Sequence, residues 1–145
     1  MKLTLTNLHP SLRPPRNSWR RLILQMAGLI RDSGERFSGE LPGELSVAWL
    51  DDPGMAAANW RHLRHRGPTD ILTFDYGGGR AEILISLDTA REHARRYRQT
   101  LGRELTLYLA HGILHLAGVG DKTPSQRRRM RREEKWLIQH LKPRG

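Results

Sequence analysis

Two histidines four positions apart, His111 and His115, are followed by Gly118 and then by Asp121. Residues four apart on a helix lie on one face, so both imidazoles can reach a single ion. A glycine that ends the helix would let the chain reverse, and Asp121 can then offer a third ligand. Three protein ligands leave one position open for water, which is the arrangement of catalytic rather than structural metal sites.

This spacing of two histidines, a glycine break and a third ligand is typical of metzincin metalloproteases. The glutamate that serves those enzymes as general base is replaced here by Gly112, which argues against a protease. Roughly 0.3 pairs at this spacing are expected by chance, so two hydrogen-bonded core histidines are the alternative. We predict that His111, His115 and Asp121 bind one Zn²⁺ per chain, or another divalent transition metal.

The charge balance points to a polyanionic partner. The sequence has 25 Lys and Arg against 15 Asp and Glu, a formal net charge of +10, and most of the excess lies in residues 61–145. Such a chain attracts nucleic acid or an anionic surface, and arginine's planar fork suits phosphate, although arginine usage can also reflect genome composition. We predict a phosphate-contacting face, with a merely solvated face as the alternative, at Arg127, Arg128, Arg131 and Arg132.

The same composition excludes several classes of protein. The absence of cysteine excludes disulfides, a thiol nucleophile and Cys-based zinc sites. The longest stretch without Asp, Glu, Lys or Arg, residues 105–120, is too short and too polar to span a bilayer. The N-terminal residues lack the apolar segment of a signal peptide. We therefore expect a soluble, cytoplasmic protein with no membrane partner.

Elements of both kinds must position these residues within one domain, residues 1–145. Apolar alternation and β-forming segments predict strands over 2–8, 45–50, 71–74 and 83–86, the last two joined as a hairpin through three glycines. Capping and proline signals predict five helices. The first three begin at an N-cap at Ser18, at Asp51-Asp52-Pro53 and at a capping box at Thr89. The fourth covers 104–117 with Gly118 as C-cap, and the fifth runs from a capping box at Thr123 to before Pro143.

This order predicts the α+β class: one small mixed sheet of about four strands, packed with about five helices. The helix that carries the two histidines would be similar to the metal-binding helix of the zincins.

Three segments together carry a resemblance to a known family. Residues 68–74 read Pro-Thr-Asp-Ile-Leu-Thr-Phe, residues 81–86 read Ala-Glu-Ile-Leu-Ile-Ser, and residues 111–121 form the metal segment. They resemble the YbeY family of bacterial rRNA maturation factors, whose pattern pairs P-T-D-V-L-S-F and G-D-I-x-I-S with H-G-x-L-H-L-x-G-x-D-H. Asn59 and Glu104-Leu105 are also similar to the family.

The resemblance implies a single-strand-specific, metal-dependent endoribonuclease that hydrolyses RNA phosphodiesters with metal-activated water. It implies a role in rRNA maturation, at the 3′ end of 16S rRNA, and in ribosome quality control. Ribosomal RNA or ribosomal particles are the implied partners, with a ribosomal protein or a GTPase as further candidates. His111 and His115 would then be catalytic residues as well as metal ligands.

Two positions depart from the family pattern. The last metal-binding histidine of the family is Asp121 here, which changes the hardness of that ligand. An arginine of the family falls on Leu63; either Arg61 or Arg64 takes over its catalytic role at the phosphate, or activity is weaker. The alternative functions are an RNA- or ribosome-binding assembly factor with a structural metal and, disfavoured by the missing glutamate, a metalloprotease.

Overall fold

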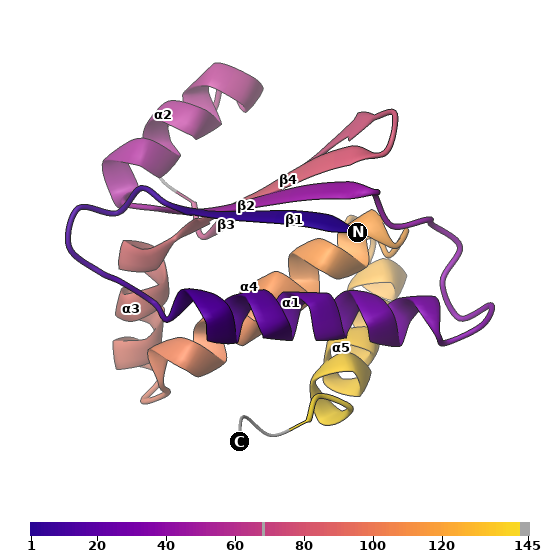
Figure 1. The fold of residues 1–145 in the computed structure, drawn as a ribbon. Coiled ribbons are helices and arrows are strands. Elements are labelled where there is room, and N and C mark those ends of the chain that lie inside the picture. Colours follow the sequence, from indigo (N-terminus) through magenta and orange to yellow (C-terminus); the bar gives the residue numbers. More distant parts are fainter. Residues whose placement is uncertain (68, 143–145) are drawn as a thin grey trace.

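The computed structural model describes residues 1–67 and 69–142, and within them the chain forms one four-stranded sheet and five helices. The predicted α+β class and the predicted order of elements are confirmed (Figure 1). Pro68, the first residue of the family segment 68–74, and Pro143, before which the last helix is predicted to end, lie outside the described residues. The elements are β1 (Lys2–Asn7), α1 (Arg16–Arg31), β2 (Glu44–Leu50), α2 (Asp52–Leu63), β3 (Ile71–Gly77), β4 (Arg80–Ser86), α3 (Leu87–Arg96), α4 (Leu101–Leu116) and α5 (Pro124–Gln139).

The sheet is mixed and has the strand order β1-β2-β4-β3. The first three of these strands are parallel, while β3 pairs antiparallel with β4 and forms one edge. The predicted hairpin is confirmed, and its turn uses Gly77, Gly78 and Gly79, all with positive φ. β3 extends to Gly77 and β4 begins at Arg80, so both strands run longer than the predicted 71–74 and 83–86.

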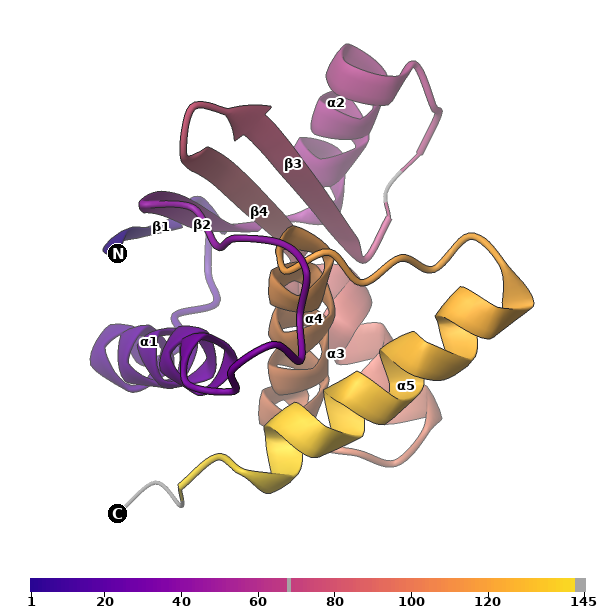
Figure 2. The same cartoon turned by 90° about the vertical axis from the view of Figure 1, so that its right-hand side faces the viewer.

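The two faces of the sheet are covered unequally. Helices α1, α3, α4 and α5 lie on one side, and α2 lies alone on the other (Figures 1 and 2). Successive strand residues point to opposite faces, so Val47 and Ile83 join the main core while Ala48 and Leu84 join a small cluster under α2. The single helix α2 therefore leaves part of the outer face open.

Helix α4 runs through the middle of the main core. It begins at the N-cap Thr100, whose hydroxyl accepts a hydrogen bond from the backbone N–H of Arg103. Leu105, Leu109 and Ile113 are at most 1% exposed, since α4 contacts α1, α3, α5 and the sheet. Even α4 falls short of a bilayer span: among the described residues, no helix is long and apolar enough to cross a membrane.

Three predicted helix starts are wrong, and for α3 the reason is a local hydrogen bond. Helix α4 begins at Leu101, three residues before the predicted Glu104. Helix α1 begins two residues before Ser18, with Pro15 at the N-cap position. Helix α3 begins at Leu87 and is capped by Ser86, because the hydroxyl of Thr89 instead donates to Asp52 at 2.7 Å. The capping box at Thr123 is confirmed. The predicted C-cap Gly118 is wrong by one position: α4 ends at Leu116 with Ala117 as its C-cap, and Gly118 follows with positive φ.

A buried polar cluster ties the loop after β1 to the starts of α2 and α3. One carboxylate oxygen of Asp88 accepts from His9 Nε2 at 2.7 Å, and the other accepts from the backbone N–H of Asp52 at 2.9 Å. The Nδ1 of His9 accepts from the backbone N–H groups of Ser11 and Leu12, so its proton is on Nε2. Burial raises the pKa of Asp88, but these hydrogen bonds and nearby positive charge lower it overall.

We expect Asp88→Asn to reduce the free energy of unfolding at pH 7 by about 1–3 kcal/mol, because a charged acceptor is lost. The pKa of Asp88 is lower in the folded than in the unfolded chain, so its stabilising effect is present above about pH 4 and disappears as pH falls through the folded pKa. Urea unfolding from pH 7 to pH 2 should show the two proteins converging in acid. The exposed Asp32→Asn is the control, and a variant as stable as wild type at pH 7 would contradict this role.

Candidate metal centre

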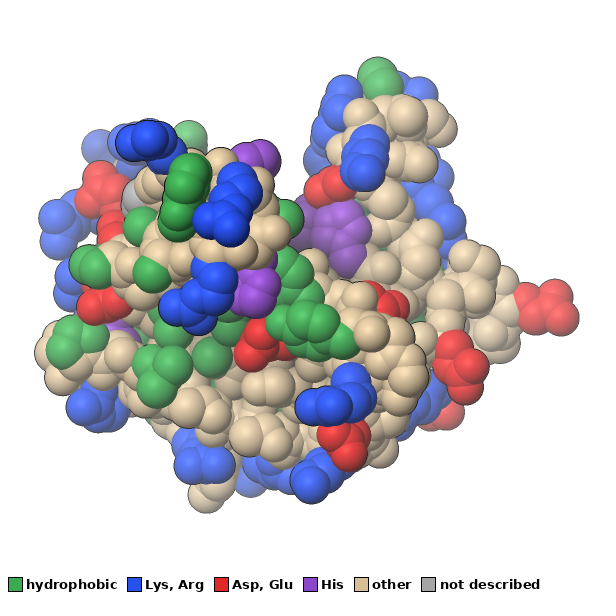
Figure 3. All heavy atoms as spheres, turned by 90° about the horizontal axis from the view of Figure 1, so that it is seen from above, with side chains coloured by type: hydrophobic (Ala, Val, Ile, Leu, Met, Phe, Trp, Pro, Cys, Tyr) green, Lys and Arg blue, Asp and Glu red, His purple; other side chains and the backbone are tan. Residues whose placement is uncertain are grey.

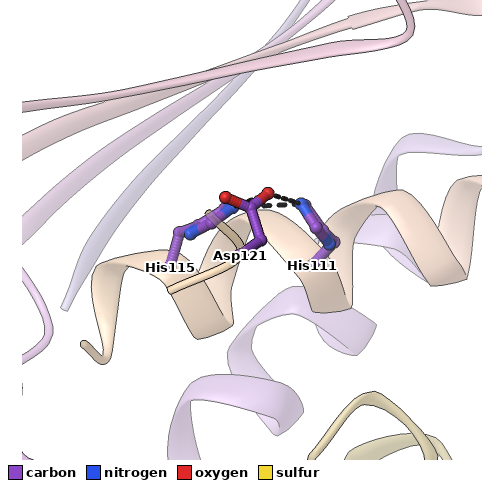
Figure 4. Close-up of side chains that lie close together, drawn as sticks. All are labelled: His111, His115 and Asp121. Atoms are coloured by element: carbon purple, nitrogen blue, oxygen red, sulfur yellow. Dashed lines mark hydrogen bonds and ion pairs between the residues drawn. The ribbon is translucent and has the colours of Figure 1, made fainter. Parts of the chain in front are cut away.

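The structure brings His111, His115 and Asp121 together at the surface of α4 (Figure 4). The Nε2 of His115 lies 3.0 Å from the Nε2 of His111 and 3.0 Å from Oδ2 of Asp121. The Nε2 of His111 lies 3.3 Å from the same carboxylate oxygen. Three donor atoms on three side chains therefore form a nearly equilateral triangle, which we call the metal site.

A tight reversal after α4 places the aspartate. Gly118 has a φ of 97°, and a Cβ at this position would lie 2.9 Å from the backbone nitrogen of Gly39. The N–H of Gly39 donates to the carbonyl of Ala117 at 2.9 Å, so two backbone segments meet without side chains between them. This contact fixes the direction in which the chain leaves α4, and Asp121 returns over the helix three residues later.

The donor atoms suit a divalent transition metal. Ligands at about 2.0–2.1 Å in a tetrahedral site are separated by about 3.3–3.4 Å, close to the distances observed here. Two imidazole nitrogens and one carboxylate oxygen form a donor set that zinc and similar ions accept. The side chains of both histidines are 27% exposed and that of Asp121 is 40% exposed, so the triangle faces solvent on one side.

A carboxylate from α5 orients the first histidine. Oε2 of Glu134 lies 3.1 Å from Nδ1 of His111, and a proton on Nδ1 directs the Nε2 lone pair into the metal site. Burial is the largest single effect on the pKa of His111 and lowers it. The hydrogen bond to Glu134 and the negative charges of Glu134, Asp121 and Asp70 outweigh it, so the pKa is raised overall.

Glu134 is not among the site residues predicted from the sequence. Two adjacent acids, Glu133 and Glu134, interrupt the basic α5, and this interruption is the sequence signal that could have indicated a role for them. The structure gives both a partner, since Glu133 is buried and paired with Arg36 at 2.7 Å.

An acidic cleft lies over the metal site. It has a volume of about 440 Å³ and is bounded by the histidines of α4 and by one face of β3. Asp70, Thr73 and Asp75 supply oxygen atoms on the β3 side. In Figure 3 a hollow with histidine in its wall lies between two lobes that carry Lys and Arg. Carboxylates at this density repel a phosphate, so an anionic substrate requires a cation between them.

Gly112 has a packing role that disfavours the protease glutamate. A Cβ at this position would lie 3.1 Å from Ile71, Ile83 and Thr73, because α4 presses against β3 and β4 there. The longer side chain of a glutamate would have to fit into the same tight contact.

The predicted arginines lie outside the cleft lining. Arg61 and Arg64 are exposed on the last turn of α2, and among the described residues that line the cleft neither is present. The guanidinium of Arg64 lies over the ring of Trp60, 5.4 Å from its centroid. Leu63, which occupies the position of the family arginine, is exposed on α2.

The arginines of α5 divide into two pairs. Helical spacing of four and three puts Arg127 and Arg131 on the same side of α5 as Glu134, which touches the metal site. By the same spacing, Arg128 and Arg132 lie about one-third of a turn further round, away from the metal site. All four are exposed.

Comparison with known proteins identifies relatives over most of the chain. A family model described as endoribonuclease YbeY matches residues 12–142. The endoribonuclease YbeY of Phocaeicola vulgatus is 39% identical over 99 residues, which cover 66% of this chain and 72% of the relative. That of Chlorobium luteolum is 42% identical over 68% of this chain and 74% of its own length. That of Anaeromyxobacter sp. is 34% identical over 92% of this chain and 69% of its own length.

A solved structure has a similar fold. The solution structure of TM1509 from Thermotoga maritima matches with a TM-score of 0.62, covering 94% of this chain and 89% of that one at 20% identity. The similarity supports the arrangement of the sheet and helices.

We expect two substitutions at the metal site to differ in severity. His115→Ala removes one of three donors and should abolish stoichiometric metal after dialysis, measured by elemental analysis. Glu134→Gln keeps all three donors but weakens the orientation of His111, and should lower metal affinity about 10- to 100-fold in competition with a chelator. Wild-type metal content in His115→Ala would refute the site, and wild-type affinity in Glu134→Gln would refute the orienting role.

Proposed function

The chain belongs to the YbeY family of metal-dependent endoribonucleases that process ribosomal RNA, and we propose that His111, His115 and Asp121 hold its catalytic metal. The observation that carries this proposal is the triangle of donor atoms open to an acidic cleft. We propose that residues 1–145 act as one catalytic domain and that the metal is zinc, because two imidazoles and a carboxylate are a common zinc donor set.

When bound, a divalent metal supplies Lewis-acid polarisation of a phosphoryl oxygen and acidifies the attacking water. The protein's own groups hold the RNA around it. Thr73 and Asp75 offer oxygen atoms that can accept hydrogen bonds from ribose hydroxyls on the β3 side of the cleft. Glu134 of α5 holds His111 in the tautomer that presents Nε2, so this carboxylate contributes to the site by orienting a ligand.

Arginines on the rim would supply the positive charge that the cleft lacks. Arg127 and Arg131 are on the side of α5 that reaches the metal site, so we propose that they contact phosphates of bound RNA more closely than Arg128 and Arg132 do. The overall charge of +10 favours this reading over a face that is only solvated.

The other candidate functions have less support. A purely structural metal is normally enclosed by four protein ligands, whereas here three ligands face solvent. A metalloprotease lacks its base at Gly112. Action at the 3′ end of 16S rRNA, single-strand specificity, ribosome quality control, and association with a ribosomal protein or a GTPase stay predictions from the family resemblance.

We expect the purified, metal-loaded protein to cut ribosomal RNA and to leave casein intact. His111→Ala should lower the rate of RNA cleavage at least about 100-fold, because the loss of one of three ligands removes the metal. Cleavage products on denaturing gels, with and without chelator, are the measurement. RNA cleavage at the wild-type rate by His111→Ala, or proteolysis that this substitution abolishes, would overturn the proposal.

The two arginine pairs of α5 provide a matched comparison of RNA contacts. For single strands the slope of log affinity against log salt is about −0.7 per phosphate contact. We therefore expect Arg127→Ala with Arg131→Ala to flatten this slope by about 1 to 1.4 units, measured by fluorescence anisotropy. Arg128→Ala with Arg132→Ala removes the same charge and should change the slope less. Equal slopes for both double variants would argue against a contact specific to Arg127 and Arg131.

A further inference from the structure

Three rings form a row on the outer face of the sheet. The imidazole of His62, on α2, lies 4.6 Å from the ring of Phe74, on β3, between centroids. Phe74 lies 6.1 Å from Tyr76 with their planes 25° apart, a stacked arrangement. We call His62, Phe74 and Tyr76 the aromatic row.

The aromatic row is accessible to a ligand. Tyr76 is 56% exposed and His62 is exposed, while Phe74 packs partly against the small cluster under α2. The hydroxyl of Tyr76 donates to Glu82 at 2.8 Å, which holds the ring in place across the strands. Ring faces held in a line and left in solvent are the surfaces on which unpaired bases stack.

Arginines gather at the C-terminal end of α2, the helix that carries His62. Arg61 is exposed on α2 next to His62, and the guanidinium groups of Arg64 and Arg66 lie 5.4 and 5.6 Å from the ring centroid of Trp60. Trp60 is itself 46% exposed. Trp60 lies two residues from His62 and so on another side of α2, but the end of this helix still combines exposed rings with arginines, the two components of a single-strand nucleic-acid track.

The row is continuous with the acidic cleft through β3. Alternate residues of a strand point to opposite faces, so Thr73 and Asp75 border the cleft while Phe74 and Tyr76 face outward. Because β3 is an edge strand, no further strand separates the two surfaces. In Figure 3 hydrophobic side chains lie directly beside the hollow that contains histidine.

We propose that the aromatic row is a stacking site for unpaired bases of the RNA strand that passes over the edge of β3 from the metal site. Arg61, Arg64 and Arg66 would contact the phosphates of that segment. This inference rests on the proposed function, and it gives the enzyme a structural reason to select single-stranded RNA next to the cleaved bond. It also gives Arg61 and Arg64 a role in holding the flanking strand instead of acting at the metal.

The test compares ring removal with ring retention, using a single-stranded RNA oligonucleotide and the metal-loaded protein. Loss of stacking on one ring should raise KM about 5- to 100-fold and leave kcat unchanged for Tyr76→Ala and for His62→Ala. Tyr76→Phe keeps the ring and loses only the bond to Glu82, so its KM should stay near that of wild type. Tyr97→Ala, at another exposed tyrosine flanked by arginines, is the matched control and should behave as wild type.

A second measurement separates this inference from the proposed function. The same oligonucleotide carrying 5-iodouracil is photo-crosslinked to the protein in chelator, where no cleavage is expected, and the attachment site is read by mass spectrometry. Attachment to the aromatic row supports stacking even if wild type cuts no RNA, in which case only the proposed function fails. If wild type cuts RNA while Tyr76→Ala and His62→Ala keep its KM, or lose kcat alone, the inference is overturned. The row then covers the sheet or binds a protein.

Discussion

The packing of α4 between the sheet and three helices is the contact on which the metal site and the cleft both depend. At Gly112 the helix lies so close to β3 and β4 that a Cβ would come within 3.1 Å of three side chains, and the neighbouring turns bury Leu109 and Ile113. This contact sets the rotation of α4 about its axis. Given that rotation, His111 and His115 can only project along one side, toward the edge of β3 and toward α5.

Charge is distributed so that a strongly basic protein keeps an acidic centre. Asp70, Asp75 and Asp121 surround the metal site, while the arginines of α2 and α5 lie on its rims. The negative centre raises the affinity for a cation, and the positive rims attract the substrate backbone. In the proposed function, substrate and metal would thus be held by different groups, so that one small surface could accept both.

The local parts of the fold and the site could be predicted from the sequence. The periodicity of the histidines, the glycine break after α4 and the capping box at Thr123 are all signals within a few residues of what they determine. The contributions missed came from contacts between distant segments. Glu134 reaches His111 across 23 positions, Ser86 caps α3 because Asp52 holds Thr89, and the aromatic row requires α2 to pack beside β3.

The three donor atoms come from only eleven consecutive residues, whereas the carboxylate that orients one of them comes from another helix. A chain that brings its ligands together by closing such short loops loses little entropy on chelation, so the unfolded polypeptide can also bind the ion. Metal binding at the proposed site would therefore stabilise the native state by less than the native affinity alone implies. During synthesis the ligands emerge before α5 does, so the ion can enter a loose site that becomes rigid only when the last helix docks.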